Sequence, residues 1–126
     1  MRAPLLASLA LVAALAGCQI AVEVRVTGTP EAPVFEFERD GGGAVSIMGL
    51  SVGTEGRPGT VWSISSDRCI DISYVIYGQA PPGFRQEAPA PRLEARRNYD
   101  VDLIGCGASG GARFAILGDQ IVAGSR

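Results

Sequence analysis

A glycine-rich segment near the end of the chain has the residue types that most resemble a catalytic or nucleotide-binding motif. It reads G-C-G-A-S-G-G from Gly105 to Gly111 and contains both G-x-G-x-x-G and G-x-S-x-G. The first pattern binds a dinucleotide only where it opens a helix, with an acidic residue about 20 positions further on. The second needs a general base, normally His, to activate Ser109. The chain contains no His and no Lys, so we interpret the segment as a flexible hairpin loop.

Two pairs of carboxylates are the next candidates for chemistry. Asp100 and Asp102 alternate with apolar residues, and Asp67 and Asp71 flank Cys69. A glycosidase needs a long cleft around its carboxylates, and a calcium loop needs regularly spaced Asp or Asn residues. The chain has neither that spacing nor the aromatic content of a sugar-binding cleft. We therefore expect solvated strand faces, no catalytic residue, no cofactor and no metal site.

The elements that hold these residues are predicted to be short strands. Apolar and polar residues alternate with the period of a half-buried strand, and no window after residue 18 suits an amphipathic helix. Ile70, Ile72, Tyr74 and Ile76 are expected to share one face of the strongest strand. The predicted strands cover residues 21–26, 34–38, 44–52, 61–65, 69–77, 99–103, 113–117 and 120–123. This spacing predicts an all-β fold of about seven to nine short antiparallel strands, a sandwich or small barrel.

A proline-rich connection, Gly78 to Pro91, separates two of these strands and cannot be helical. Phe84 and Arg85 lie at its middle. Aromatic and Arg side chains are favoured anchors of protein interfaces, so these two residues are candidates for contacting a partner. The alternative is a rigid connection with Phe84 packed against the domain.

The beginning of the chain predicts a location. Leu5 to Ala16 is apolar and follows Arg2; it is shorter than the roughly 20 residues of a membrane span and suits a secretory signal. The sequence Leu15-Ala16-Gly17-Cys18 then resembles the lipobox of bacterial lipoproteins. The resemblance implies cleavage before Cys18, a diacylglycerol on its sulfur and acylation of the new amine. The alternative is an ordinary signal peptide with a chance cysteine.

The lipoprotein resemblance also implies an organisation and a compartment. Residues 1–17 are the signal peptide, 18–30 the lipid anchor with a tether or first strand, and 31–126 the β-sandwich domain. Gln19, where Asp would favour retention in the inner membrane, favours the outer membrane, with the domain facing the periplasm. Loss of Arg2 changes the net charge of −2 to about −3, which gives no electrostatic argument for nucleic-acid binding.

Once Cys18 is assigned to lipid, the two other cysteines remain. Cys69 and Cys106 would be joined by the oxidising envelope, closing a loop of nearly 40 residues and stabilising the domain by about 3–4 kcal/mol. The alternative is two buried free thiols. Without His they would make a poor zinc site.

A local pattern narrows the expected fold. Leu93 lies six residues before Tyr99, and Val101 two residues after it. This resembles the tyrosine corner of fibronectin type III and related immunoglobulin-like domains, which implies that the Tyr99 hydroxyl bonds back to the backbone near the strand entry. The sequence departs from that family in its Ala95-Arg96-Arg97 segment and in its cysteine pair.

Together these features predict a lipid-anchored envelope protein with one immunoglobulin-like sandwich. We expect a non-catalytic binding or accessory module whose partners are the membrane, through Cys18, and an envelope protein. The alternative is an inhibitor or a ligand- or glycan-binding lipoprotein, and less favoured is a small His-free enzyme. The sequence does not identify the partner, the biological process or the oligomeric state.

Overall fold

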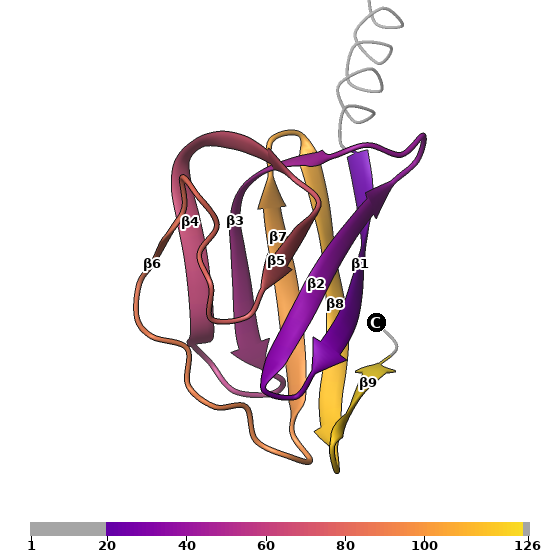
Figure 1. The fold of residues 1–126 in the computed structure, drawn as a ribbon, viewed down its shortest axis with the longest axis vertical. Helices are drawn as coiled ribbons and strands as arrows, with labels where there is room; N and C mark the ends of the chain where they lie inside the picture. Colours follow the sequence, from indigo (N-terminus) through magenta and orange to yellow (C-terminus); the bar gives the residue numbers. More distant parts are fainter. Residues whose placement is uncertain (1–19, 125–126) are drawn as a thin grey trace, which may run out of the picture.

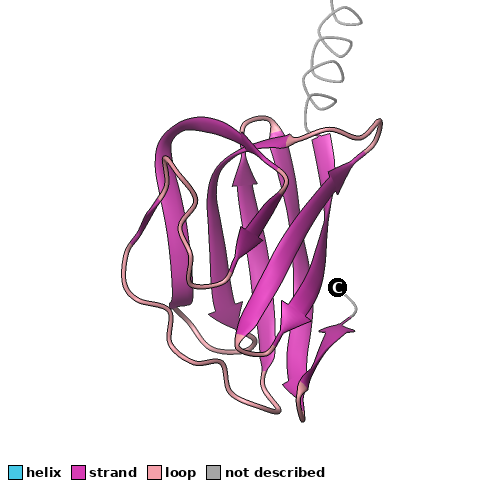
Figure 2. Ribbon diagram, viewed as in Figure 1, coloured by secondary structure: helices cyan, strands magenta, loops and turns pink. Residues whose placement is uncertain are grey.

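The computed structural model describes residues 20–124, and these residues form nine strands and no helix (Figure 1, Figure 2). The prediction of an all-β fold is confirmed. The lipobox and Cys18 lie outside the described residues. The strands are β1 (Ile20–Thr29), β2 (Ala32–Arg39), β3 (Val45–Thr54), β4 (Thr60–Ile72), β5 (Tyr74–Ile76), β6 (Arg85–Gln86), β7 (Asn98–Gly105), β8 (Ala108–Leu117) and β9 (Gln120–Gly124).

The strands form a curled mixed sheet in the order β5-β2-β1-β8-β7-β3-β4-β6, with β9 paired to β8. The expectation of a purely antiparallel arrangement is wrong at one place, because β1 and β8 pair in parallel, with Val22 opposite Gly110. Strand β1 begins at the end of the molecule where the turn after β7 leads into β8, so β1 and β8 run in the same direction (Figure 1). Residues 18–30 are expected to contain either a tether or a first strand, and residues 20–29 form a strand, β1.

The chain changes strands at Ser73, where the sequence predicts one continuous strand over residues 69–77. Residues 60–72 are a single strand, β4, and β5 begins at Tyr74 and pairs with β2 instead. The face that is buried changes at this crossing. Val75 is fully buried, whereas Tyr74 is 52% exposed. The expected common face of Ile70, Ile72, Tyr74 and Ile76 is therefore divided between two strands.

The hydrophobic core lies inside the curl and takes residues from every strand except β6 and β9. Its largest fully buried side chains include Phe35 and Phe114, whose ring centroids are 5.9 Å apart. The Tyr99 ring stacks on the Phe114 ring, with the ring centroids 5.4 Å apart. The buried hydrophobic residues are Val22, Val24, Phe35, Phe37, Val45, Ile47, Leu50, Val52, Trp62, Ile64, Val75, Tyr77, Leu93, Tyr99, Val101, Leu103, Ala108, Phe114 and Ile116.

Tyr99 also fixes the connection that enters β7. Its hydroxyl oxygen accepts a hydrogen bond of 2.8 Å from the backbone N–H of Glu94. Leu93, directly before that N–H, is 7% exposed and belongs to the core. The tyrosine thus ties the entering segment to the start of β7, which is the contact that the corner pattern predicts.

Cys69 and Cys106 form a disulfide. Cys69 lies in β4, and Cys106 lies in the turn between β7 and β8. Strand β3 runs between β4 and β7, so the bridge connects the two neighbours of β3. It does so at the end of the molecule where β1 begins, because Val45 and Ile47 at the start of β3 pair with Ile72 and Ile70.

Candidate binding site

The curled sheet is open on one side, and a loop crosses the opening. Strands β5 and β6 are the two ends of the hydrogen-bonded path. The first part of the proline-rich connection, from Gly78 to Phe84, leads from β5 to β6 and therefore spans this gap (Figure 1). A loop that covers sheet edges protects their unpaired backbone groups. Here it also creates a hollow.

Side chains hold the connection at both ends. At its start, the Tyr77 backbone N–H donates to the Pro33 carbonyl oxygen. The Tyr77 hydroxyl donates to the Pro91 carbonyl oxygen at 2.6 Å. At its end, Trp62 Nε1 donates to Gln86 Oε1 at 2.9 Å. The Trp62 and Tyr77 rings meet edge to face, with centroids 5.1 Å apart. The part of the loop between these contacts is therefore attached to the domain on both sides.

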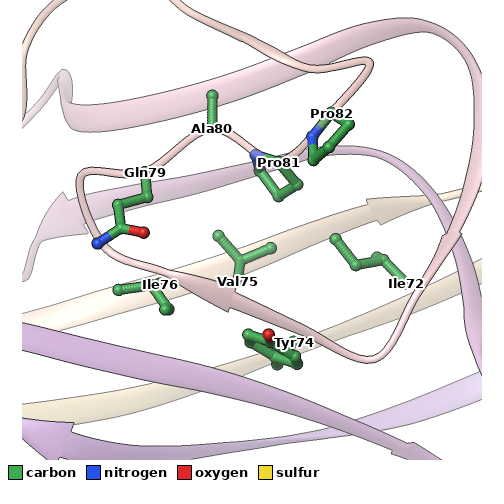
Figure 3. Close-up of a pocket in the computed structure, with 8 residues that line it drawn as sticks. All are labelled: Ile72, Tyr74, Val75, Ile76, Gln79, Ala80, Pro81 and Pro82. Atoms are coloured by element: carbon green, nitrogen blue, oxygen red, sulfur yellow. The ribbon is translucent and has the colours of Figure 1, made fainter.

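An apolar pocket of about 380 Å³ lies under this loop (Figure 3). Residues 79–82 form one wall, with Pro81 and Pro82 facing β5 across the pocket. Ile72 and residues 74–76 form the other wall, which includes the half-exposed Tyr74. Mostly apolar walls with a few polar groups are typical of ligand and peptide sites. Tyr74 and Gln79 are the two lining residues whose side chains carry a polar group.

Phe84 and Arg85, the residues predicted as interface anchors, lie just beyond this pocket, and their side chains lie in different environments. Phe84 is half-buried and packs against the core, as in the alternative interpretation of the connection. Arg85 points to solvent and makes two hydrogen bonds, of 3.0 and 3.3 Å, to the Asp67 carboxylate. The Arg85 guanidinium donates to that carboxylate and lowers the pKa of Asp67 below its usual value. Arg85 thus presents an ion pair, and its role in an interface remains a prediction.

The glycine-rich motif belongs to the packing of β8. Gly107 has a φ of +73° in the turn, a conformation that favours glycine. A Cβ on Gly110 would lie 2.3 Å from the Val22 carbonyl oxygen of β1. These glycines therefore allow a tight turn and a close parallel strand pair. Ser109 is exposed on β8, opposite Ile104 of β7.

The candidate carboxylates lie at the surface. Asp100 accepts a 3.0 Å hydrogen bond from Arg113 Nε, which places a positive charge beside it. Asp71 and Asp102 are exposed. Within residues 20–124, no group of three or more His, Cys, Asp or Glu side chains is placed to hold a metal ion.

Sequence reasoning missed Tyr74, Ile72 and Ile76 as pocket residues, because alternation placed them on a core-facing strand. The run V-I-Y after Tyr74 is apolar on both faces, and this is the feature of the sequence that could have indicated a second apolar surface here. Such a strand has a second apolar face that another segment must cover. The proline-rich connection partly covers it.

In the part of the chain that the structure describes, no helix is long and apolar enough to cross a membrane. No protein-family model matches this chain, and a search of the curated proteins finds no relative.

Proposed function

We propose that the protein is a lipid-anchored envelope protein whose single domain is a non-catalytic binding module, with an envelope protein as its partner. The observation that carries the binding role is the pocket between β5 and residues 79–82. Tyr74, which is 52% exposed, is one of the residues that line this pocket, as are Pro81 and Pro82. Aromatic side chains in a defined apolar hollow are favoured sites for an apolar anchor from a partner protein.

The anchoring part of the proposal rests on the lipobox resemblance. Acylation of Cys18 would attach the protein to a bacterial membrane, and Gln19 favours the outer membrane. Two or three acyl chains hold a small domain durably, since each buried CH₂ contributes roughly 0.8 kcal/mol. The disulfide agrees with an oxidising compartment such as the periplasm.

The proposal also assigns an immunoglobulin-like sandwich. Strands β5, β2 and β1 would form one layer, and β8, β7, β3 and β4 the other. This order corresponds to E-B-A facing G-F-C-C′ in that fold, where the corner tyrosine lies on strand F. Tyr99 lies on β7, the strand that corresponds to F. The disulfide departs from the B–F bridge of antibody domains, because it joins β4 to the turn after β7.

Site-specific photocrosslinking in living cells tests the binding role. A photoreactive amino acid replaces Tyr74 in one variant and Leu117 in a control variant. The control is matched in exposure, because Leu117 is 51% exposed, and it lies on β8, outside the pocket. We expect a covalent adduct with one dominant envelope protein from position 74 and none from position 117.

Two further readouts separate the parts of the proposal. Incorporation of a labelled fatty acid should be lost in Cys18→Ser, and the adduct at position 74 should weaken because the domain leaves the membrane. Equal crosslinking at positions 74 and 117 would contradict the binding site. Turnover of an envelope substrate that disappears in Ser109→Ala would contradict the non-catalytic assignment.

A further inference from the structure

We infer that the domain rests directly on the membrane, with one defined end in the layer of phospholipid headgroups. This inference rests on the proposed lipidation of Cys18. The contacting surface, named the anchor end, comprises the start of β1, the loop 40–44 and the turn 105–108. These segments lie together at one end of the strands (Figure 1).

The length of chain between anchor and domain dictates the contact. Strand β1 begins at Ile20, two residues after Cys18. Two extended residues span at most about 7 Å. Ile20 is also fixed in the fold, because its N–H donates to the Gly107 carbonyl oxygen at 2.8 Å. The headgroup layer of one leaflet is about 5–7 Å thick. Ile20, at the anchor end, is thus held within roughly that distance of the lipidated residue.

The surface of the anchor end suits this position. Ile20 and Ile104, two of the exposed large hydrophobic residues of the described chain, are 44% and 58% exposed. Both lie here, because Ile20 pairs with Ala108 and Ile104 pairs with Ser109, next to the turn after β7. Exposed apolar side chains gain from burial at the boundary of headgroups and acyl chains.

Charged residues accompany these apolar ones at the anchor end. Arg39, the last residue of β2, and Asp40, the first residue of the loop 40–44, are both exposed. The Arg39 Nε donates to the Gly42 carbonyl oxygen at 3.0 Å and holds the loop in place. Charges of both signs suit the zwitterionic and charged groups of a headgroup layer better than a hydrocarbon interior. The anchor end therefore rests on the membrane without inserting deeply.

Quenching by spin-labelled lipid tests the orientation. Ala44 at the anchor end and Ala95 at the far end are both exposed, and each is replaced by Cys in the full lipidated protein. Cys69 and Cys106 are bridged and Cys18 is lipidated, so a fluorophore couples to the introduced thiol. A strand of ten residues is about 33 Å long. In vesicles whose phospholipids carry a nitroxide on the headgroup, we expect several-fold stronger quenching at position 44 than at position 95.

A spacer variant identifies the cause. Ten Gly/Ser residues inserted after Gln19 add a flexible span of about 17 Å, so quenching at position 44 should fall toward that at position 95. Unchanged quenching would contradict the role of the short connection. Equal, weak quenching at both positions in protein whose acylation is verified by mass would overturn the inference alone. Absence of the acyl mass would instead overturn the proposed anchoring.

Discussion

The three tyrosines of this chain occupy three different environments. Tyr99 is buried, and its hydroxyl accepts from the backbone of Glu94. Tyr77 is buried, and its hydroxyl donates to the backbone of Pro91. Tyr74 is half-exposed at the pocket. The first two fix the two ends of the segment from Pro91 to Glu94, whereas the third is available to a partner.

Removing the Tyr99 hydroxyl should destabilise the domain. Tyr99→Phe leaves the Glu94 N–H without its 2.8 Å acceptor. We expect a loss of about 1 kcal/mol, the usual contribution of a hydrogen bond, because this bond is part-buried. Unfolding in urea measures the change. Tyr74→Phe, on a side chain that is 52% exposed, is the control and should change stability little. Equal stability of the two variants would show that the Tyr99 hydroxyl does not hold the entry to β7.

The Tyr77 hydroxyl makes stability depend on alkaline pH. Burial, with a smaller contribution from Tyr99, raises the pKa of Tyr77 from 10.0 to about 12. The unfolded chain therefore loses this proton at lower pH than the folded chain does. The stabilisation is fully present below pH 10 and is lost as pH rises toward 12. The free energy of unfolding, followed from pH 8 to 11.5, should fall less steeply in Tyr77→Phe. Parallel curves would contradict this assignment.

Gly110 should not tolerate a side chain. A Cβ there would approach the Val22 carbonyl oxygen to 2.3 Å and force β1 and β8 apart. We expect Gly110→Ala to cost more than about 1 kcal/mol and to speed hydrogen exchange in β1. Gly53→Ala is the matched control within a strand, because its Cβ would lie at an ordinary 3.4 Å from the Gly59 carbonyl oxygen. A similar effect of both substitutions would disprove the close approach as the cause.

At the scale of strands, alternation predicts most elements and fails where both faces of a strand are apolar. The pattern V-E-V-R-V places Val22 and Val24 in the core, and both are buried. In the run from Cys69 to Tyr77, apolar residues occupy both faces, so local pattern cannot reveal that the chain crosses to another strand at Ser73. Residue 74 then becomes part of the pocket, which no spacing in the sequence predicts.

Pairing between distant strands is the other feature that local pattern does not contain. The parallel contact of β1 with β8 joins residues about ninety positions apart in the chain. Alternation specifies which face of a strand is buried, but not which strand becomes its neighbour. The glycine at position 110 makes the contact possible, and in the sequence it resembles part of a nucleotide-binding motif.

The disulfide should contribute a large part of the stability of the strands at the anchor end. Its two cysteines are 37 residues apart, so the bridge should stabilise by about 3–4 kcal/mol in the chain-entropy model. The double variant Cys69→Ser/Cys106→Ser should unfold at correspondingly lower urea concentration. Native protein treated with a reductant should behave like this variant. Two reactive thiols in the unreduced mature protein would contradict the bridge.

At the scale of the whole molecule, we expect the fold of the described domain to be independent of the proposed lipid anchor. Among the described residues, the buried hydrophobic core extends from Val22 in β1 to Ile116 in β8. Its stability should therefore not depend on lipid. We expect the thermal unfolding midpoint of the secreted Cys18→Ser protein to lie within a few degrees of that of the lipidated protein in detergent. In a domain of this size, a difference of 1 kcal/mol in stability would shift the midpoint by about 4–8 °C.

Binding should respond differently from stability to the loss of the anchor. Attachment through Cys18 would confine the pocket to a thin layer beside the membrane, which would raise the effective concentration of a partner embedded in the same membrane. Cys18→Ser should therefore weaken crosslinking from position 74 while leaving the unfolding midpoint unchanged. A large drop in the midpoint would instead mean that the lipid-bearing segment belongs to the folded unit. Unchanged crosslinking would mean that the partner is soluble in the same compartment.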